Sequence, residues 1–163
     1  MGKLAFLFPG QGAQVVGMGK DFFDTYDLAK KRFAEADEAL GYSISKLCFE
    51  GPADRLKLTE HTQPAILTVA VIASEILRSE GVVPEIAAGH SLGEYAALVA
   101  AGVLSFQDAV LLVHKRGAYM QEAVPVGEGA MAAVIGLDDE TIVSACAEAS
   151  SVGAVQAVNF NCP

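Results

Sequence analysis

The chain has 163 residues, of which 52% are hydrophobic and 19% are charged, and its formal net charge is −9. This composition excludes a disordered chain, because it offers enough apolar surface for one ordinary domain or for part of a larger one. The acidic balance argues against a broad nucleic-acid-binding surface. No apolar run reaches the roughly 18 residues that a membrane span needs, so a soluble, cytoplasmic protein is expected.

The N-terminal half of the chain alternates short apolar runs with helical patterns. Leu4–Phe8 is an apolar run without alternation, which predicts a strand buried on both faces. Lys20–Leu40 repeats apolar side chains at helical spacing and stops at Gly41, which predicts one helix. Pro64 is expected to begin a helix through Leu77 that is apolar nearly all round and therefore lies in the core.

The same alternation continues through the middle of the chain. Glu85–Gly89 is predicted to be a second buried strand, and Leu92–Ala101 the helix that follows it. Ser105 and Asp108 have the spacing of a capping box, which predicts a helix from Ser105 to about Glu122.

A segment rich in proline and glycine, Pro125–Gly129, precedes a second pattern of strand, helix and strand. These three elements are expected at Ala130–Ile135, Asp138–Ala149 and Ala154–Phe160. Because strands and helices alternate throughout, the predicted fold class is α/β. Residues 1–127 are expected to form one part, and residues 128–163 to begin a second, smaller subdomain.

The segment Gly89-His90-Ser91-Leu92-Gly93 matches the G-x-S-x-G pattern of a nucleophile elbow. Such a turn between a strand and a helix holds the serine in a strained conformation, and glycines two residues to either side avoid collisions. The free N–H groups of the following helix favour an anion beside the serine, and the Leu92 N–H is the natural oxyanion donor. The alternative is that Ser91 merely caps the helix.

A second glycine-rich turn, Pro9–Gly12, follows the first predicted strand and is a candidate source of another oxyanion donor. A dinucleotide-binding fingerprint is excluded there, because Val15 stands where the third glycine would be. A tight structural turn remains the alternative.

Arg116 lies within an apolar stripe of its predicted helix, where a guanidinium needs an anionic partner. Two interpretations stay open: an internal ion pair with Glu94, Glu122 or another acid, or a clamp for a substrate carboxylate.

None of the three histidines, at positions 61, 90 and 114, has the placement expected of a general base for Ser91. The three cysteines, at positions 48, 146 and 162, lie far apart and without zinc-ligand spacing, so they are interpreted as buried free thiols and no metal site is expected.

Taken together, these segments resemble the malonyl-CoA:acyl carrier protein transacylase family. The resemblance rests on FPGQGAQ at Phe8–Gln14, TQPA at Thr62–Ala65, GHSLGEYAAL at Gly89–Leu98, HKRGAYMQEAVP at His114–Pro125, GAMAAVIGLDD at Gly129–Asp139 and VNFNCP at Val158–Pro163. It implies an α/β-hydrolase-like large subdomain with a ferredoxin-like small subdomain, of which the sequence holds the N-terminal portion.

The resemblance also implies the roles of individual residues. Ser91 would carry the acyl group as an ester, with the backbone N–H groups of Gln11 and Leu92 forming the oxyanion hole. Arg116 would pair with the free carboxylate of malonyl. The other positions at the acyl pocket would be His90, Met120 and Asn161.

The implied activity is transfer of malonyl from malonyl-CoA to the phosphopantetheine thiol of acyl carrier protein in fatty acid synthesis, without a cofactor and by a monomer. Three alternatives stay open: an acyltransferase domain of polyketide synthesis, a serine thioesterase or esterase, and a carrier-protein-binding module without activity. In the family the chain continues past VNFNCP and there supplies the catalytic histidine. The base is therefore expected beyond Pro163, and the 163-residue piece alone is expected to be inactive, whereas the start at Met1 favours a stand-alone enzyme.

Overall fold

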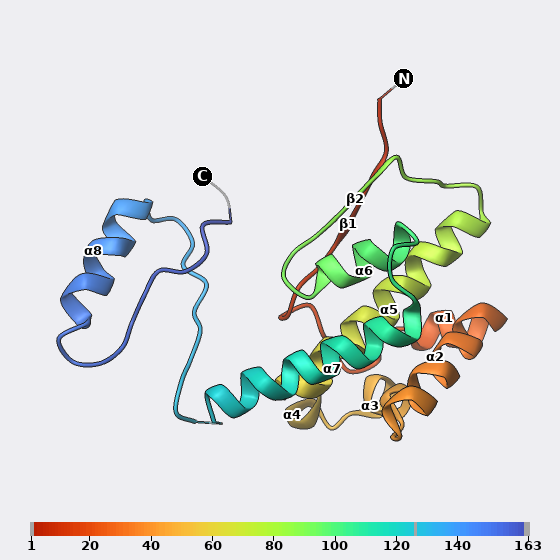
Figure 1. The fold of residues 1–163 in the computed structure, drawn as a ribbon, viewed down its shortest axis with the longest axis horizontal. Coiled ribbons are helices and arrows are strands. Elements are labelled where there is room, and N and C mark those ends of the chain that lie inside the picture. Colours follow the sequence, from red (N-terminus) through yellow and green to blue (C-terminus); the bar gives the residue numbers. More distant parts are fainter. Residues whose placement is uncertain (1, 126, 162–163) are drawn as a thin grey trace. The chain divides into compact units, whose positions relative to one another are not determined.

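The computed structural model of the chain describes residues 2–125 and 127–161, which divide into two compact units between residues 126 and 127 (Figure 1). The first unit contains a pair of parallel strands, β1 (Ala5–Phe8) and β2 (Ile86–Gly89). Both strands lie where the sequence predicts them. Among the described residues, none of the helices combines the length and the apolar character that crossing a bilayer requires.

The two strands pair in register from Ala5 opposite Ile86 to Phe8 opposite Gly89. Their burial corrects one expectation, because the strands are covered on one face only within the described residues. Phe8 is buried, whereas the side chain of Leu7 is 78% exposed and that of Ile86 is 51% exposed. An apolar run without alternation predicts cover on both faces, and in the described part of the chain the helices cover only one.

Helix α5 (Thr59–Ser79) forms the centre of the first unit, and most of its residues are buried (Figure 1). It begins five residues before the expected start, so Pro64 lies inside the helix instead of at its first position. Glu60 in the first turn favours the earlier start, because its negative charge is stabilised at a helix N-terminus. Pro64 remains near enough to the start that it removes one helical hydrogen bond without ending the helix.

The predicted helix over Lys20–Leu40 is two helices, α1 (Lys20–Thr25) and α2 (Asp27–Leu40). Tyr26 between them has extended backbone angles, φ −118° and ψ 126°, which interrupt the helix. Gly41 adopts a left-handed conformation at φ 71° and ends α2, as the sequence predicts.

Two short helices, α3 (Ile44–Glu50) and α4 (Ala53–Leu56), were not expected from the sequence. Each is too short to display a helical period. The local signal for α3 is Ser43, whose side chain accepts a hydrogen bond from the backbone N–H of Lys46. Both helices contribute to the core, with Ile44, Cys48 and Leu56 fully buried or nearly so.

Helices α6 (Gly93–Ala100) and α7 (Phe106–Ala123) lie where the sequence predicts them. The side chain of Ser105 accepts a hydrogen bond of 3.1 Å from the backbone N–H of Asp108, which caps α7. Helix α7 packs closely on α5, and a Cβ atom at Gly117 would lie 2.5 Å from the carbonyl oxygen of Thr59. Glycine is therefore required where these two helices touch.

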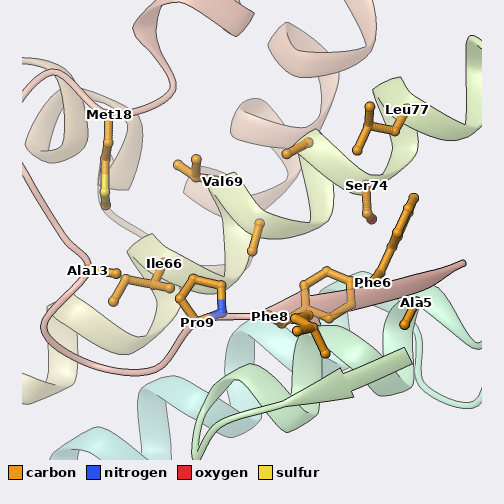
Figure 2. A pocket seen from close by; sticks show the side chains of 13 residues that line it. Ala5, Phe6, Phe8, Pro9, Ala13, Met18, Ile66, Val69, Ser74 and Leu77 are labelled. Atoms are coloured by element: carbon orange, nitrogen blue, oxygen red, sulfur yellow. The ribbon is translucent and has the colours of Figure 1, made fainter. Parts of the chain in front are cut away.

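An apolar cavity of about 390 Å³ lies between β1 and α5 (Figure 2). In Figure 2, Phe6 and Phe8 from the strand and Ile66, Val69 and Leu77 from the helix surround it. All of its lining side chains are apolar except that of Ser74.

The second unit contains helix α8 (Asp139–Ala149), close to the predicted bounds, and its cap residue Asp138 accepts a hydrogen bond of 2.8 Å from the backbone N–H of Thr141. The two strands predicted at Ala130–Ile135 and Ala154–Phe160 are extended segments without strand pairing among the described residues, which corrects that expectation. A strand exists only through hydrogen bonds to a neighbour, and among the described residues neither segment has such a neighbour.

Candidate active site

The serine at the end of β2 has the backbone of a nucleophile elbow. Ser91 has φ 54°, a left-handed conformation that is rare for a residue with a side chain. A Cβ atom at Gly89 would overlap the backbone of Gly93, so the turn can close only with glycine at that position. The G-x-S-x-G spacing therefore follows from contacts within the turn. Helix capping by Ser91, which was the alternative interpretation, does not require these close contacts or the two glycines.

The turn after β1 packs directly against this elbow. A Cβ atom at Gly93 would overlap the carbonyl oxygen of Phe8, and one at Gly10 would lie 2.5 Å from Nδ1 of His90. The backbone N–H of His90 also donates a hydrogen bond of 3.0 Å to the carbonyl oxygen of Phe8. Two segments that are far apart in the sequence are thus held together, and Gln11 lies in the turn beside the elbow.

The backbone N–H groups of Gln11 and Leu92 are among those at this junction that have no acceptor within the described residues. Helix α6 begins just after them, with the N–H groups of Gly93 and Glu94 bonded to the carbonyl oxygens of His90 and Ser91. Free donors at the start of a helix are suited to an oxyanion that forms beside Ser91. The side chain of Gln11 is held separately, by a hydrogen bond of 3.3 Å from its Nε2 to Oγ1 of Thr59.

Arg116 on α7 reaches the serine. Its Nη2 donates a hydrogen bond of 3.0 Å to Oγ of Ser91, and its Nη1 donates one of 2.7 Å to Oε1 of Gln63. The guanidinium is half-buried, yet within residues 2–125 and 127–161 it forms no ion pair with a carboxylate. The interpretation of an internal ion pair with Glu94 or Glu122 is therefore wrong. A cation without an anion beside a serine can bind an anionic ligand.

Gln63 is a residue of this network that the sequence reasoning missed. Its side chain is fully buried in α5, and besides accepting from Arg116 it donates from Nε2 to Sδ of Met120 at 3.3 Å. Met120 lies one helical turn after Arg116, so Gln63 contacts two successive positions on α7. A polar amide inside an otherwise apolar helix was the signal that could have identified it, because buried amides need partners.

The histidines have other contacts. Nδ1 of His61 lies 3.1 Å from the hydroxyl oxygen of Tyr42, and Nδ1 of His114 lies 3.0 Å from the carbonyl oxygen of Glu60. Burial lowers the pKa of His61, which keeps its imidazole neutral. The ring of His90 lies against Gly10 in the turn after β1.

A sequence profile of the acyl transferase domain matches residues 5–158, which is nearly the whole chain. The chain belongs to the acyl transferase domain family. Among curated proteins, the acyl transferase chain is 52% identical to malonyl CoA-acyl carrier protein transacylase of Bacillus subtilis and 53% identical to the protein of the same name from Escherichia coli. Each comparison covers 100% of this chain. These curated relatives are about twice as long, since the matched region is 52% and 53% of their lengths.

Solved structures give the same result. An acyl carrier protein S-malonyltransferase from Vibrio cholerae superposes with a TM-score of 0.88 at 50% identity, over 99% of this chain and 53% of that one. A malonyl-transacylase solved in complex with a type II polyketide synthase acyl carrier protein superposes with a TM-score of 0.92 at 46% identity, again over 99% and 53%. The fold of the acyl transferase chain is therefore the mixed α/β fold of these enzymes.

Two sets of predicted residues lie outside the site built above. Asn161 belongs to the second unit of the acyl transferase chain, and its place at the acyl pocket stays a prediction. Cys48 is buried, which raises the pKa of its thiol to about 12, and Cys146 is half-buried, while Cys162 lies outside the described residues. The described residues hold no group of histidine, cysteine and acidic side chains suited to a metal ion.

Proposed function

We propose that the acyl transferase moves a malonyl group from malonyl-CoA to the phosphopantetheine thiol of an acyl carrier protein, by way of an ester on Ser91. The observation that carries this proposal is the Arg116 guanidinium, which bonds to Oγ of Ser91 and has no carboxylate partner among the described residues. A malonyl group has a thioester carbonyl at one end and a free carboxylate at the other. The carbonyl would lie at Ser91 while the carboxylate contacts Arg116. The names of the relatives support the same substrates.

The reaction follows a ping-pong course. Oγ of Ser91 attacks the thioester carbonyl of malonyl-CoA, and the negative charge that forms on the carbonyl oxygen is stabilised by the N–H groups of Gln11 and Leu92. The carbon–sulfur bond then breaks, and CoA leaves as the thiol after taking up the proton that Ser91 lost. The carrier thiol attacks the Ser91 ester in the same way, which forms the new thioester and returns the proton to the serine.

The base that moves this proton is proposed to be a histidine beyond Pro163, as the family resemblance implies. His61 and His114 do not fit the role, because among the described residues their rings contact Tyr42 and the Glu60 carbonyl and not Oγ of Ser91, which accepts from Arg116. We propose accordingly that the 163-residue chain alone transfers malonyl poorly.

Substrate selection is assigned to Arg116, which would form two parallel hydrogen bonds with the malonyl carboxylate. Gln63 would hold the guanidinium in the orientation for this pairing. His90, Met120 and Asn161 are proposed to line the acyl pocket, and the backbone of Gln11 to contact the substrate carbonyl. No cofactor takes part in the proposed chemistry.

The finer architecture is also a proposal. Residues 1–127 would be part of an α/β-hydrolase-like large subdomain, which is supported by the parallel pair β1–β2 and the elbow at the carboxyl end of β2. Residues 128–163 would begin a ferredoxin-like small subdomain, which α8 and its flanking apolar segments support. We propose that the enzyme acts as a monomer in the cytoplasm.

The test is the mass of the intact protein after brief exposure of the full natural chain to malonyl-CoA. We expect the mass to rise by one malonyl group in the parent protein and to stay unchanged in Ser91→Ala. Ser151→Ala, which removes an exposed serine of the second unit, should acquire the group as the parent does. A malonyl adduct that persists in Ser91→Ala would overturn the assignment of the nucleophile.

The fate of the acyl group separates the proposal from its alternatives. A transferase should release CoA slowly without carrier protein and rapidly with it, whereas a thioesterase should release malonate at the same rate in both cases. A binding module would retain carrier protein on a column without any turnover. Carriers from fatty acid and polyketide synthesis present the same thiol, and comparison of their rates identifies the preferred one.

A further inference from the structure

Proline inside α5 leaves one backbone carbonyl without its usual partner. Pro64 has no N–H, so the carbonyl of Glu60, four residues earlier, receives no helical hydrogen bond from that position. The carbonyl is instead 3.0 Å from Nδ1 of His114, which lies on α7. Because a carbonyl can only accept, the imidazole donates the hydrogen bond, and its Nδ1 atom must carry a proton.

The bond lies where α5 and α7 are closest. A Cβ atom at Gly117 would lie 2.7 Å from Cα of Glu60, so α7 touches the backbone of α5 directly at this point. Val113 and Gly117 form the buried stripe of α7, and His114 and Arg116 lie on its two opposite sides. From these two sides of the stripe, His114 reaches the Glu60 carbonyl of α5 and Arg116 reaches Gln63, three residues further along the same helix.

Two polar contacts, one on each side of the buried stripe of α7, prevent α7 from rotating about its axis against α5. Small and apolar residues at the contact, here Val113 and Gly117, resist such rotation only weakly because they offer no directional bond. The half-buried imidazole also contacts an aromatic ring, since the Tyr42 ring lies 5.9 Å from that of His114 between ring centres. His114 is therefore held in one orientation as well as bonded.

We propose that His114 is a positioning residue for the substrate clamp: its hydrogen bond to the carbonyl that Pro64 leaves open fixes the rotation of α7 and thereby aims Arg116 at Ser91. This inference rests on the proposed function for its effect on the reaction. The hydrogen bond of His114 and its dependence on Pro64 do not rest on the proposed function. His114 itself touches neither Ser91 nor the guanidinium of Arg116 among the contacts of the described residues.

The first test compares malonyl and acetyl transfer in variants of the full natural chain. His114→Leu removes the donor, whereas His114→Asn keeps an N–H near the position of Nδ1. We expect His114→Leu to lower kcat/KM for malonyl-CoA on the order of tenfold, because a displaced clamp loses alignment, and to leave acetyl-CoA transfer within about twofold. His114→Asn should restore most of the loss, and Gln107→Leu, an exposed substitution on the same helix, should have no effect. Equal losses on both substrates, or no rescue by asparagine, would overturn the proposal.

The second test is a double-mutant cycle on stability with Pro64→Ala, which restores the missing N–H. In the parent background, His114→Leu leaves the Glu60 carbonyl without a donor. The substitution should therefore lower the ratio of folded to unfolded protein at equilibrium on the order of tenfold. In the Pro64→Ala background the alanine N–H satisfies the carbonyl, so the same substitution should cost less than about threefold. An equal cost in the two backgrounds would contradict the role given to Pro64.

The third measurement separates failure of this inference from failure of the proposed function. Nitrogen NMR of the parent protein should find Nδ1 of His114 protonated, and Pro64→Ala should shift its resonance. If Nδ1 is instead the unprotonated atom of a neutral ring, the inference fails whatever the substrate is. The NMR and the cycle could agree with expectation while Arg116→Ala leaves the malonyl preference intact. In that case the carboxylate-binding role of Arg116 is wrong, and the role of His114 in the contact between α5 and α7 is retained.

Discussion

At the residue scale, the site is built from positions where close backbone contacts leave no room for a Cβ atom. The elbow closes because Gly89 and Gly93 have no Cβ, and the turn after β1 approaches it because Gly10 has none. This backbone presents the side chain of Ser91, and Arg116 donates a hydrogen bond to its Oγ. Reactivity at Ser91 therefore depends on backbone geometry, and selectivity depends on how Arg116 is held.

Gln63 carries the first prediction at this scale. Gln63→Leu removes the acceptor for Nη1 of Arg116 and the donor to Met120, so the guanidinium loses its alignment. We expect kcat/KM for malonyl-CoA to fall about 10- to 100-fold, as misplacement of a binding group by about 1 Å can do. The measurement is steady-state transfer to carrier protein.

The matched control is Thr68→Val, which removes another buried polar group of α5, one that bonds only to the Pro64 carbonyl at 2.8 Å. That variant should lose stability by about 1 kcal/mol and keep its kcat/KM. If Gln63→Leu transferred malonyl as fast as Thr68→Val, the buried amide would have no part in orienting the arginine.

Sequence patterns identified Ser91, Leu92 and Arg116 as candidates, because elbow spacing and a cation in an apolar stripe are visible locally, whereas the role of Gln11 came from the family resemblance. These patterns could not choose between an ion pair and a substrate clamp for Arg116, since that choice depends on which side chains α5 presents to α7. Gln63 was missed for the same reason: its partners lie more than 50 residues away along the chain.

At the scale of elements, α5 and α7 determine where the clamp lies, and a cluster at their base links them to the rest of the first unit. The ring of His61 packs edge-on to Tyr42 at 5.2 Å between ring centres, and Nδ1 of His61 contacts the Tyr42 hydroxyl. Glu60 beside it lies 3.6 Å from Nε2 of His61. Burial outweighs this carboxylate, so the pKa of His61 lies below its ordinary value of 6.5.

The pKa of His61 predicts how stability depends on pH. Above about pH 6.5 the imidazole is neutral in the folded and the unfolded chain and contributes no pH dependence. As the pH falls below that value, the unfolded chain binds a proton before the folded chain does, so the free energy of unfolding decreases until the folded-state pKa is passed. Denaturant unfolding from about pH 7 to about pH 5 should therefore show a loss that His61→Gln reduces. An unchanged slope in His61→Gln would assign the loss to other groups.

Element boundaries were predictable where a residue forces them and not where packing does. Gly41 and Ser105 end and begin helices through backbone preference and side-chain capping, and the sequence predicted both. Tyr26 interrupts a helical pattern with an extended backbone, for which the sequence carries no local signal. Pro64 was predicted to begin a helix because proline favours the first helical position, although α5 begins at Thr59.

At the scale of the whole molecule, the uncovered face of the β1–β2 pair is the main departure from an ordinary domain. Leu7 and Ile86 are exposed although their strands have the composition of a central sheet. The extended segments of the second unit are similarly apolar, with the side chain of Ile135 92% exposed. The sequence predicted β1 and β2 correctly, but the strands predicted in the second unit are not formed among the described residues, because pairing and cover depend on neighbours, which local patterns do not contain.

This face predicts the behaviour of the 163-residue chain in solution. An exposed apolar patch binds hydrophobic dyes and promotes association, so we expect the chain to enhance the fluorescence of anilinonaphthalene sulfonate. Leu7→Lys should reduce the enhancement, because the Leu7 side chain is 78% exposed. Phe33→Leu, a change inside the core, is the control for altered packing and should not reduce it. Equal dye binding by the parent and Leu7→Lys would show that the patch is not the binding surface.

The most direct test of the account is the effect of Arg116→Ala on acyl selectivity in the full natural chain, measured as kcat/KM for malonyl-CoA and acetyl-CoA with the same carrier protein. The account predicts that malonyl transfer falls on the order of 100-fold or more, as loss of the charged partner of a carboxylate implies, while acetyl transfer holds or rises. Arg116→Lys keeps the charge without the paired geometry and should lie between them. Equal losses for malonyl and acetyl would contradict the assignment of Arg116 as the carboxylate clamp.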